Sequence, residues 1–224
     1  MVVEVDRDRL VELAAEADCM FHVVPALGGF VPAGAALIRV EGDPSRVDRA
    51  AAADAVTFAL ERTLDQDVAY GFRMLVDMAE RALSDSPFLD PTTAVQAIDR
   101  LHDGLRQLAV RKFPDGRFRD ASGRVRMTMP VMSWEAYVHL AFDEIRLAGI
   151  ESPQVTRRLV AALEDLLDVA PPERRPVLQQ QLEQIFEATK ATGRDDRDQE
   201  LAITPDHLGI GPRAGDGPRA TSSR

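Results

Sequence analysis

Apolar residues recur at two different spacings along the chain, and the change between them divides the sequence. Over residues 1–44, short apolar runs are separated by turns rich in Gly and Pro, which is typical of a small mixed α/β unit. The elements expected there are a strand at 2–5 and a helix at 8–17, followed by two apolar runs at 19–24 and 35–40. From residue 45 the apolar positions return every three or four residues, which predicts a helical domain over 45–191.

Helix starts in the second segment coincide with residues that can accept hydrogen bonds from free backbone N–H groups. The expected helices start at Ser45, Gln66, Pro91, Ser133, Pro153 and Pro172. The first is expected to bury Val47, Val56, Ala59 and Leu60. The third is expected to be capped by Asp90. Short connections between the last helices predict antiparallel neighbours in a bundle.

Two further segments depart from the helical pattern. Residues 111–130 contain two turn motifs and a strict alternation of side chains, which predicts a β-hairpin inserted into the helical domain. Residues 192–224 lose periodicity and gain Gly, Pro, Asp, Arg and Ser, so we expect a disordered tail there. The predicted fold class is α+β, mostly α.

Composition excludes several classes of function. The 224 residues carry a net charge of −10, which argues against nucleic-acid binding. No apolar run approaches the roughly 20 residues that a membrane-spanning helix needs, and no secretory signal opens the chain, so a cytoplasmic location is expected. Cys19 is the single cysteine, which excludes an intrachain disulfide framework. Phosphate loops, dinucleotide fingerprints and nucleophile elbows are absent, so the sequence predicts no cofactor and makes an enzyme the minor interpretation.

Charged and polar residues gather on the two helices predicted at 66–83 and from Pro91, and on the turns before them. They are Arg62, Gln66, Asp67, Asp77, Arg81, Asp90, Thr93 and Asp99. If two helix N-termini converge there, their N–H groups and arginines could bind an anion, while paired carboxylates could bind a cation or act as acid and base. The alternative is structural, because Asp67 and Asp90 fit N-caps and Asp77 with Arg81 fits an ordinary i,i+4 pair.

Two other groups of residues have both a functional and a structural interpretation. Glu135, His139 and Asp143 share one helix face with the spacing of metal ligands, but such a face is also typical of solvent exposure, and no metal site is predicted. The hairpin is locally basic and could contact anions or anionic lipid headgroups, or simply face water. Its candidate residues are Arg117, Arg119, Arg124 and Arg126.

Several segments resemble a bacterial family of predicted membrane proteins, catalogued as domain of unknown function 2254. They are ERT at 61–63 with QD at 66–67, RALS at 81–84, DPTTAVQAIDRL at 90–101, GRVR at 123–126 and FDEIR at 142–146. The resemblance covers about residues 2–190. This sequence departs from the family at 88–91, where it has Phe-Leu-Asp-Pro in place of the usual Asn-Asp-Pro.

The resemblance implies a role beside a membrane. Members of the family typically carry several transmembrane helices ahead of a region like this one, and their activity is not established. We therefore expect either an extramembrane portion or a stand-alone relative, acting as a regulatory or assembly module at the inner membrane, with a membrane-protein partner or as a homo-oligomer. The alternative is a carboxylate- or metal-dependent enzyme, or a small-ligand-binding protein, that uses the cluster of residues 62–99.

Overall fold

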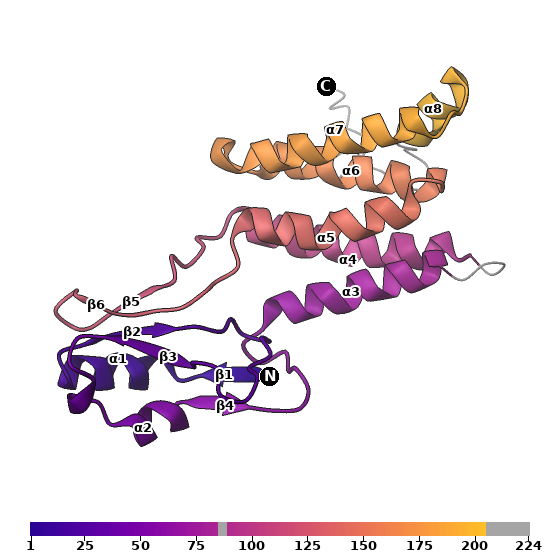
Figure 1. The fold of residues 1–224 in the computed structure, drawn as a ribbon. Coiled ribbons are helices and arrows are strands. Elements are labelled where there is room, and N and C mark those ends of the chain that lie inside the picture. Colours follow the sequence, from indigo (N-terminus) through magenta and orange to yellow (C-terminus); the bar gives the residue numbers. More distant parts are fainter. Residues whose placement is uncertain (85–88, 205–224) are drawn as a thin grey trace, which may run out of the picture. The chain divides into compact units, whose positions relative to one another are not determined.

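The computed structural model describes residues 1–84 and 89–204, which form two compact units (Figure 1). Unit 1 consists of Met1–Gly71 and Phe113–Met132, and unit 2 of Phe72–Lys112 and Ser133–Arg224. Helices predominate and two small sheets accompany them, which confirms the α+β, mostly α class. Across the described ranges, every helix is too short or too polar to cross a bilayer.

Unit 1 holds both sheets. Its elements are β1 (Val2–Val5), α1 (Arg7–Glu16), β2 (Met20–Val23), β3 (Ile38–Glu41), a 3₁₀ turn (Pro44–Arg46), α2 (Arg49–Asp54), β4 (Val56–Phe58), β5 (Arg117–Arg119) and β6 (Val125–Thr128). The predicted hairpin is present as β5 and β6, but it does not stand alone. β6 pairs in parallel with β2, giving a four-stranded sheet of order β3-β2-β6-β5. The hairpin therefore completes the sheet of the N-terminal unit.

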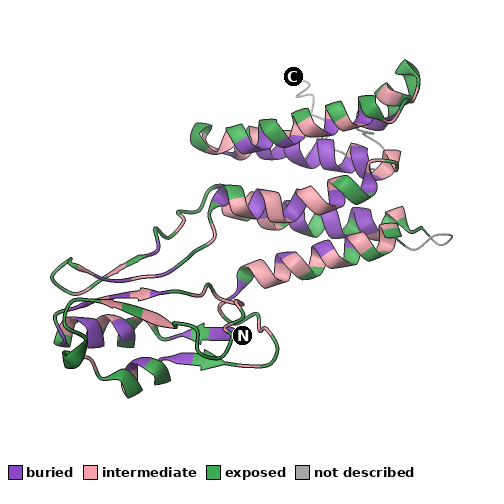
Figure 2. Cartoon of the chain, in the orientation of Figure 1, coloured by how far each residue is buried: buried purple, intermediate pink, exposed green. Residues whose placement is uncertain are grey.

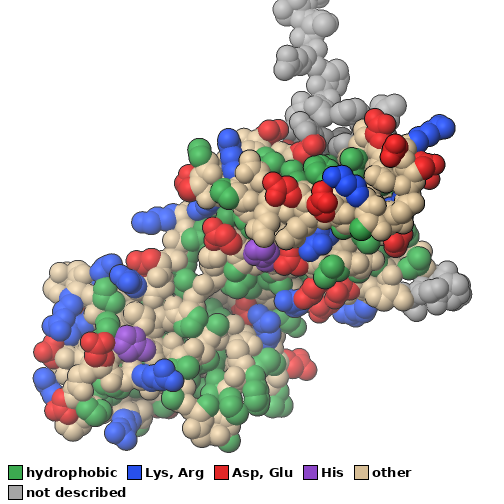
Figure 3. Space-filling view, turned by 45° about the horizontal axis from the view of Figure 1, so that its top comes forward, with side chains coloured by type: hydrophobic (Ala, Val, Ile, Leu, Met, Phe, Trp, Pro, Cys, Tyr) green, Lys and Arg blue, Asp and Glu red, His purple; other side chains and the backbone are tan. Residues whose placement is uncertain are grey.

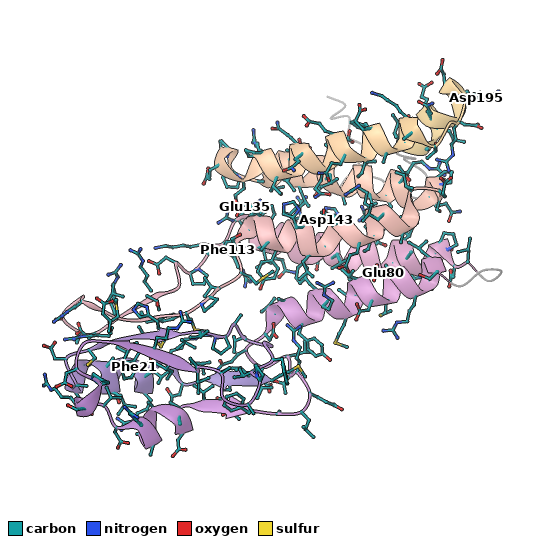
Figure 4. All side chains as sticks on the ribbon, viewed as in Figure 1. Phe21, Glu80, Phe113, Glu135, Asp143 and Asp195 are labelled. Atoms are coloured by element: carbon teal, nitrogen blue, oxygen red, sulfur yellow. The ribbon has the colours of Figure 1, made fainter. Side chains whose placement is uncertain are left out.

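The core of unit 1 lies between this sheet and α1. Alternation along β2 sends Phe21 and Val23 inward, and Phe21 is labelled in the interior of the unit in Figure 4. They share one hydrophobic cluster with Leu10 and Leu13 of α1 and with Met127 of β6. Because β2 and β6 are far apart in the sequence, a single buried cluster joins the two chain segments of this unit.

The prediction of a helix that starts at Ser45 is wrong over most of the helix's expected length. A six-residue helix, α2, begins at Arg49 and is capped by Asp48, which accepts a hydrogen bond from the Ala51 N–H (3.0 Å). The chain then forms β4, which pairs antiparallel with β1. Alanine spacing suits a helix, but the β-branched and aromatic residues after it favour a strand where β1 offers a free edge. Leu60, expected in the core, is 97% exposed.

Unit 2 is a helical bundle built around α6. The helices are α3 (Val68–Ser84), whose first turn belongs to unit 1, α4 (Pro91–Ala109), α5 (Trp134–Gly149), α6 (Pro153–Val169), α7 (Arg175–Ala191) and α8 (Asp196–Ile203). The predicted caps hold, since Asp90 accepts from the Thr93 N–H (3.1 Å) and Ser133 from the Ala136 N–H (3.2 Å). α6 packs against α4, α5, α7 and α8, and it is buried along most of its length (Figure 2). Burial on several sides is what the centre of a bundle requires.

Two predicted segments fall partly outside the described residues. The turn expected at 84–90 includes residues 85–88, which the structure does not describe. The tail expected from residue 192 contains α8, with Asp195 as its N-cap, so a helix takes the place of disordered chain there. Residues 205–224 of that tail also lie outside the described part.

Gly149, the last residue of α5, lies where the bundle leaves no room for a side chain. A Cβ there would stand 2.4 Å from Val155 Cγ1 and 3.2 Å from Leu83 Cδ1. We expect Gly149→Ala to lower the free energy of unfolding by about 1–3 kcal/mol through overpacking, as measured by urea denaturation. Gly71→Ala is the control: its Cβ would meet only Leu64 Cδ2 at 3.6 Å, and Ala favours a helix. Equal stabilities of the two variants would contradict this packing.

Candidate functional site

The most completely built polar site lies within unit 2, between α4 and α6. Asp99, His102 and Arg106 occupy one face of α4, and Arg158 and Asp165 occupy the facing side of α6. His102, Arg158 and Asp165 are at most 8% exposed. Charged residues are seldom buried unless they are paired, so this cluster has to be satisfied internally.

Hydrogen bonds connect all five side chains. Asp165 Oδ2 accepts from His102 Nε2 (2.8 Å) and from Arg106 Nη1. Arg158 Nη2 donates to His102 Nδ1 (2.8 Å), and Arg158 Nε donates to Asp99 Oδ1 (2.5 Å). Because Nδ1 faces a guanidinium that can only donate, the proton of the imidazole belongs on Nε2. The geometry therefore requires a neutral His102.

The pKa values follow from the same contacts. Burial, followed by the charge of Arg158, lowers the pKa of His102 below its ordinary value of 6.5. Burial alone would raise the pKa of Asp165, yet the hydrogen bonds from Arg106 and His102 hold it below its ordinary value of 3.8. Around neutral pH the network therefore contains an ionised Asp165, a neutral His102 and two guanidinium groups. Arg106 donates a hydrogen bond to Asp165, and Arg158 donates one to His102.

Asp99 links this network to the surface. Its side chain is 47% exposed and lines a cavity of about 250 Å³ between α3 and α4, together with Gln96 and Arg100. The other lining residues are Leu75, Met78 and Ala97. Chemically, the cavity offers one carboxylate, one guanidinium and one amide to a small ligand. His102 lies behind Arg158 in the hydrogen-bonded chain that starts at Asp99.

Three of the eight residues predicted as a cluster, Arg62, Gln66 and Asp67, lie in unit 1, on the segment that leads into α3. Asp67 is 5% exposed and forms an ion pair with Arg62 (Nη2 to Oδ2, 2.6 Å). Its other oxygen accepts from the Tyr70 N–H (3.0 Å), and the Arg62 guanidinium lies over the Tyr70 ring. Gln66 Oε1 accepts from the Val5 N–H (3.2 Å). The bond from the Tyr70 N–H fits the predicted N-cap role of Asp67, and the other contacts are an ion pair, a ring contact and a bond to β1.

The remaining five residues of the predicted cluster lie in unit 2. Arg81 Nε donates to the backbone oxygen of Asp77 (3.1 Å), and the Asp77 carboxylate is not its partner. Asp90 accepts from the hydroxyl and the backbone N–H of Thr93, which lowers the pKa of Asp90. Asp99 is the one member that joins the buried network described above. The predicted group is thus divided between local caps, one ion pair and one network.

Sequence reasoning missed Arg106, Arg158 and Asp165 as members of a site. A pattern was available, because Asp165 interrupts an apolar run between Leu163 and Leu166 that faces the core. A charged residue at a core position of a helix needs a buried partner. Its partner could not be identified without knowing that α4 and α6 are neighbours.

The candidate metal ligands on α5 do not form a cluster of three. His139 Nδ1 lies 3.1 Å from Asp143 Oδ2, and the buried Gln181 donates its amide to Asp143 Oδ1 (2.6 Å). Figure 4 shows Glu135 near the start of α5, separated from Asp143. Within residues 1–84 and 89–204, no group of three or more His, Cys, Asp or Glu side chains is placed to hold a metal ion.

The four candidate arginines of the hairpin have different environments. Arg126 is buried and donates to Asp120 Oδ2 (2.7 Å), Asp18 Oδ1 (3.0 Å) and the Cys19 carbonyl (3.3 Å). Its guanidinium, followed by the Ser122 hydroxyl, holds the pKa of Asp120 far below its usual range. Arg126 therefore fastens the hairpin to the turn between α1 and β2.

The other three hairpin arginines keep more contact with water. Arg124 is 63% exposed and pairs with Asp18 (3.0 Å), and Arg119 lies 3.9 Å from the Asp115 carboxylate. Arg117 is exposed. Exposed pairs of this kind contribute little to stability, so these three side chains are available to other anions.

Asp165 supports a first prediction for this site. Asp165→Asn removes the charge that Arg106 and His102 bind inside the bundle, so we expect the free energy of unfolding to fall by about 3–5 kcal/mol. Thermal or urea unfolding followed by circular dichroism measures the change. Asp168→Asn, at an exposed position of the same helix, should alter stability by no more than about 0.5 kcal/mol. Equal effects at both positions would show that the buried network adds nothing.

His102 supports a prediction about pH. The unfolded chain binds a proton at His102 with a pKa near 6.5, and the folded chain binds it only at lower pH. Stability is therefore lost as pH falls through about 6.5, until the folded pKa is passed. In His102→Gln, the free energy of unfolding should decline less between pH 7 and pH 5 than in the native protein. Parallel declines would show that the folded state protonates His102 normally.

Comparison with known proteins identifies the family to which the chain belongs. The model of a family described as predicted membrane protein, domain of unknown function 2254, matches residues 1–165. Uncharacterized proteins from Mycobacterium bovis and Mycobacterium tuberculosis are each 31% identical over 206 aligned residues, and the alignments cover 89% of this chain. The chain spans 39% of the length of these relatives.

No solved structure matches the chain. The family match covers both segments of unit 1 and the α4–α6 network as far as Asp165. It also covers every segment on which the sequence resemblance rested, the last of which ends at residue 146. Since the family model spans more than half of the chain, the protein belongs to this bacterial family of predicted membrane proteins of unknown function.

Proposed function

We propose that the chain is a non-enzymatic extramembrane module that rests on a lipid bilayer through unit 1, on the cytoplasmic side of the inner membrane. The observation that supports this proposal is a group of exposed apolar side chains, called here the β1 patch. It consists of Phe30, Phe58, Leu60 and Leu64, which are between 49% and 97% exposed. Such groups are uncommon on proteins that meet only water, and they mark interaction surfaces.

Backbone pairing brings three members of the β1 patch, Phe30, Phe58 and Leu60, to the same end of unit 1. Gly29 accepts from the Val2 N–H (2.9 Å), and the Ala59 N–H donates to Met1 on the other side of the strand (3.0 Å). Phe30 and the pair of Phe58 and Leu60 therefore flank the start of β1. The space-filling view shows hydrophobic side chains gathered at this end of unit 1 (Figure 3).

A bilayer is the occupant that fits this surface best. Aromatic and leucine side chains are the ones that enter the boundary between headgroups and acyl chains. The family is described as one of membrane proteins, and this chain spans only part of its longer relatives. Exposed acidic residues beside the patch, Glu61 and Asp65, disfavour anionic headgroups, so the patch itself should not require anionic lipid.

The hairpin arginines are proposed as a second, weaker contact. Arg117, Arg119 and Arg124 can add on the order of 1 kcal/mol each near an anionic surface, whereas Arg126 is already bound by two carboxylates. An increase of vesicle binding with anionic lipid would come from these side chains. The alternative function, ligand binding or catalysis at the carboxylates of residues 62–99, has support only from Asp99 and the cavity that it lines.

Flotation with vesicles tests the β1 patch. We expect the native chain to float with vesicles of phosphatidylcholine, and more strongly when phosphatidylglycerol is added. Leu60→Ser combined with Leu64→Ser should lower the fraction bound to phosphatidylcholine about tenfold, because two apolar side chains lose their burial in the bilayer. Both residues are exposed, so the fold should be unaffected.

A matched control uses exposed apolar residues of unit 2. Val110→Ser combined with Leu147→Ser removes side chains that are 71% and 69% exposed and should leave flotation unchanged. Flotation that is absent, or that persists fully in the β1-patch variant, would overturn the proposal. If light scattering instead shows a dimer that the β1-patch variant abolishes, the patch binds a second copy of the chain and the lipid proposal is wrong.

A further inference from the structure

Unit 1 contains an apolar cavity of about 420 Å³ that none of the β1-patch residues lines. This volume falls in the range of about 300–1,000 Å³ that holds small organic ligands. Its walls come from β2, β3, the 3₁₀ turn and α2, and the lining residues are Phe21, Leu37, Ile38, Val40, Pro44, Val47, Arg49, Ala52 and Ala53. The cavity is independent of the proposed membrane contact.

The cavity exists because the inner face of β3 has no bulky cover. Register pairs Val40 with Phe21 and Ile38 with Val23, so the aliphatic residues of β3 point to the same side as the core residues of β2. α1 packs mainly on β2, β5 and β6. α2 offers only alanines at 50–53, whose methyl groups leave the space between helix and strand unfilled.

One charged residue, Arg49, lines this otherwise apolar cavity. Among the residues that the structure describes, no carboxylate lies within ion-pair distance of its guanidinium. The nearest acidic neighbour in sequence, Asp48, accepts the Ala51 N–H as the cap of α2. Arg49 is itself exposed, so it places a positive charge without a carboxylate partner at the solvent-facing edge of the aliphatic cavity.

We propose that this cavity binds a medium-chain fatty acid, with its hydrocarbon chain against Ile38, Val40 and Val47 and its carboxylate paired with Arg49. An aliphatic chain gains from burial against these side chains, and the carboxylate supplies the partner that the guanidinium lacks. A neutral hydrocarbon would leave Arg49 unpaired, and a cationic amphiphile would be repelled by it. Complementary charge and an apolar body select this class of ligand.

Titration of the full chain with dodecanoate carrying carbon-13 at its carboxylate tests the proposal by NMR. We expect saturable binding and a shift of the carboxylate resonance. Arg49→Gln should weaken the affinity at least about tenfold, as expected for the loss of a charge-assisted hydrogen bond. Ala53→Phe should abolish binding because its ring occupies the cavity, and since Ala53 is exposed, the fold should tolerate the ring.

Two controls separate pairing from nonspecific attraction. Arg39 is exposed on the opposite face of β3, so Arg39→Gln should bind dodecanoate as the native chain does. The uncharged methyl ester should bind more weakly and respond little to Arg49→Gln. The proposal is overturned if dodecanoate fails to saturate the native chain, if Ala53→Phe binds it equally well, or if Arg39→Gln and Arg49→Gln have equal effects. Flotation of the β1-patch variant is a separate result and does not affect this one.

Discussion

The parallel pairing of β2 with β6 is the constraint on which the rest of unit 1 depends. Phe21 and Met127 are partners in this pairing, more than one hundred positions apart in sequence, and both are fully buried. Without it the hairpin would have no sheet to join, and β2 would have one neighbour in place of two. Arg126 reinforces the pairing by binding Asp18 and the Cys19 carbonyl at the turn that leads into β2. Contacts between such distant segments are slow to form but specify one topology.

In unit 2 the corresponding constraint is electrostatic. α6 is the central helix, and it carries Arg158 and Asp165 at positions where an aliphatic side chain would bury more easily. Removing charges from water has a large free-energy penalty, which good pairing offsets. The benefit is specificity: His102 can satisfy Arg158 and Asp165 at once only when α4 and α6 meet in one register. The network therefore selects a particular helix packing and does not act as a simple source of stability.

Local features of the fold were predictable from the sequence, and long-range ones were not. The caps at Asp90 and Ser133, the hairpin and the first strand follow from residue types and spacing over a few positions. The strand at Val56–Phe58 was missed because its partner, β1, lies more than fifty residues away. The same limit applies to the polar site. Asp99 was named from its neighbourhood in sequence, whereas Arg158 and Asp165 belong to a helix whose position only the folded bundle defines.

The order of segments in unit 1 has a consequence for dividing the protein. The chain leaves this unit after Gly71, returns at Phe113 and leaves again after Met132. A fragment that ends at residue 71 would lack two of the four strands of the larger sheet, and its edge at β2 would expose unpaired backbone groups. A fragment that begins at residue 72 would contain β5 and β6 without β2, the strand with which β6 pairs. No single cut therefore yields two complete halves, and expressing unit 1 by itself would require joining its two segments with a designed linker.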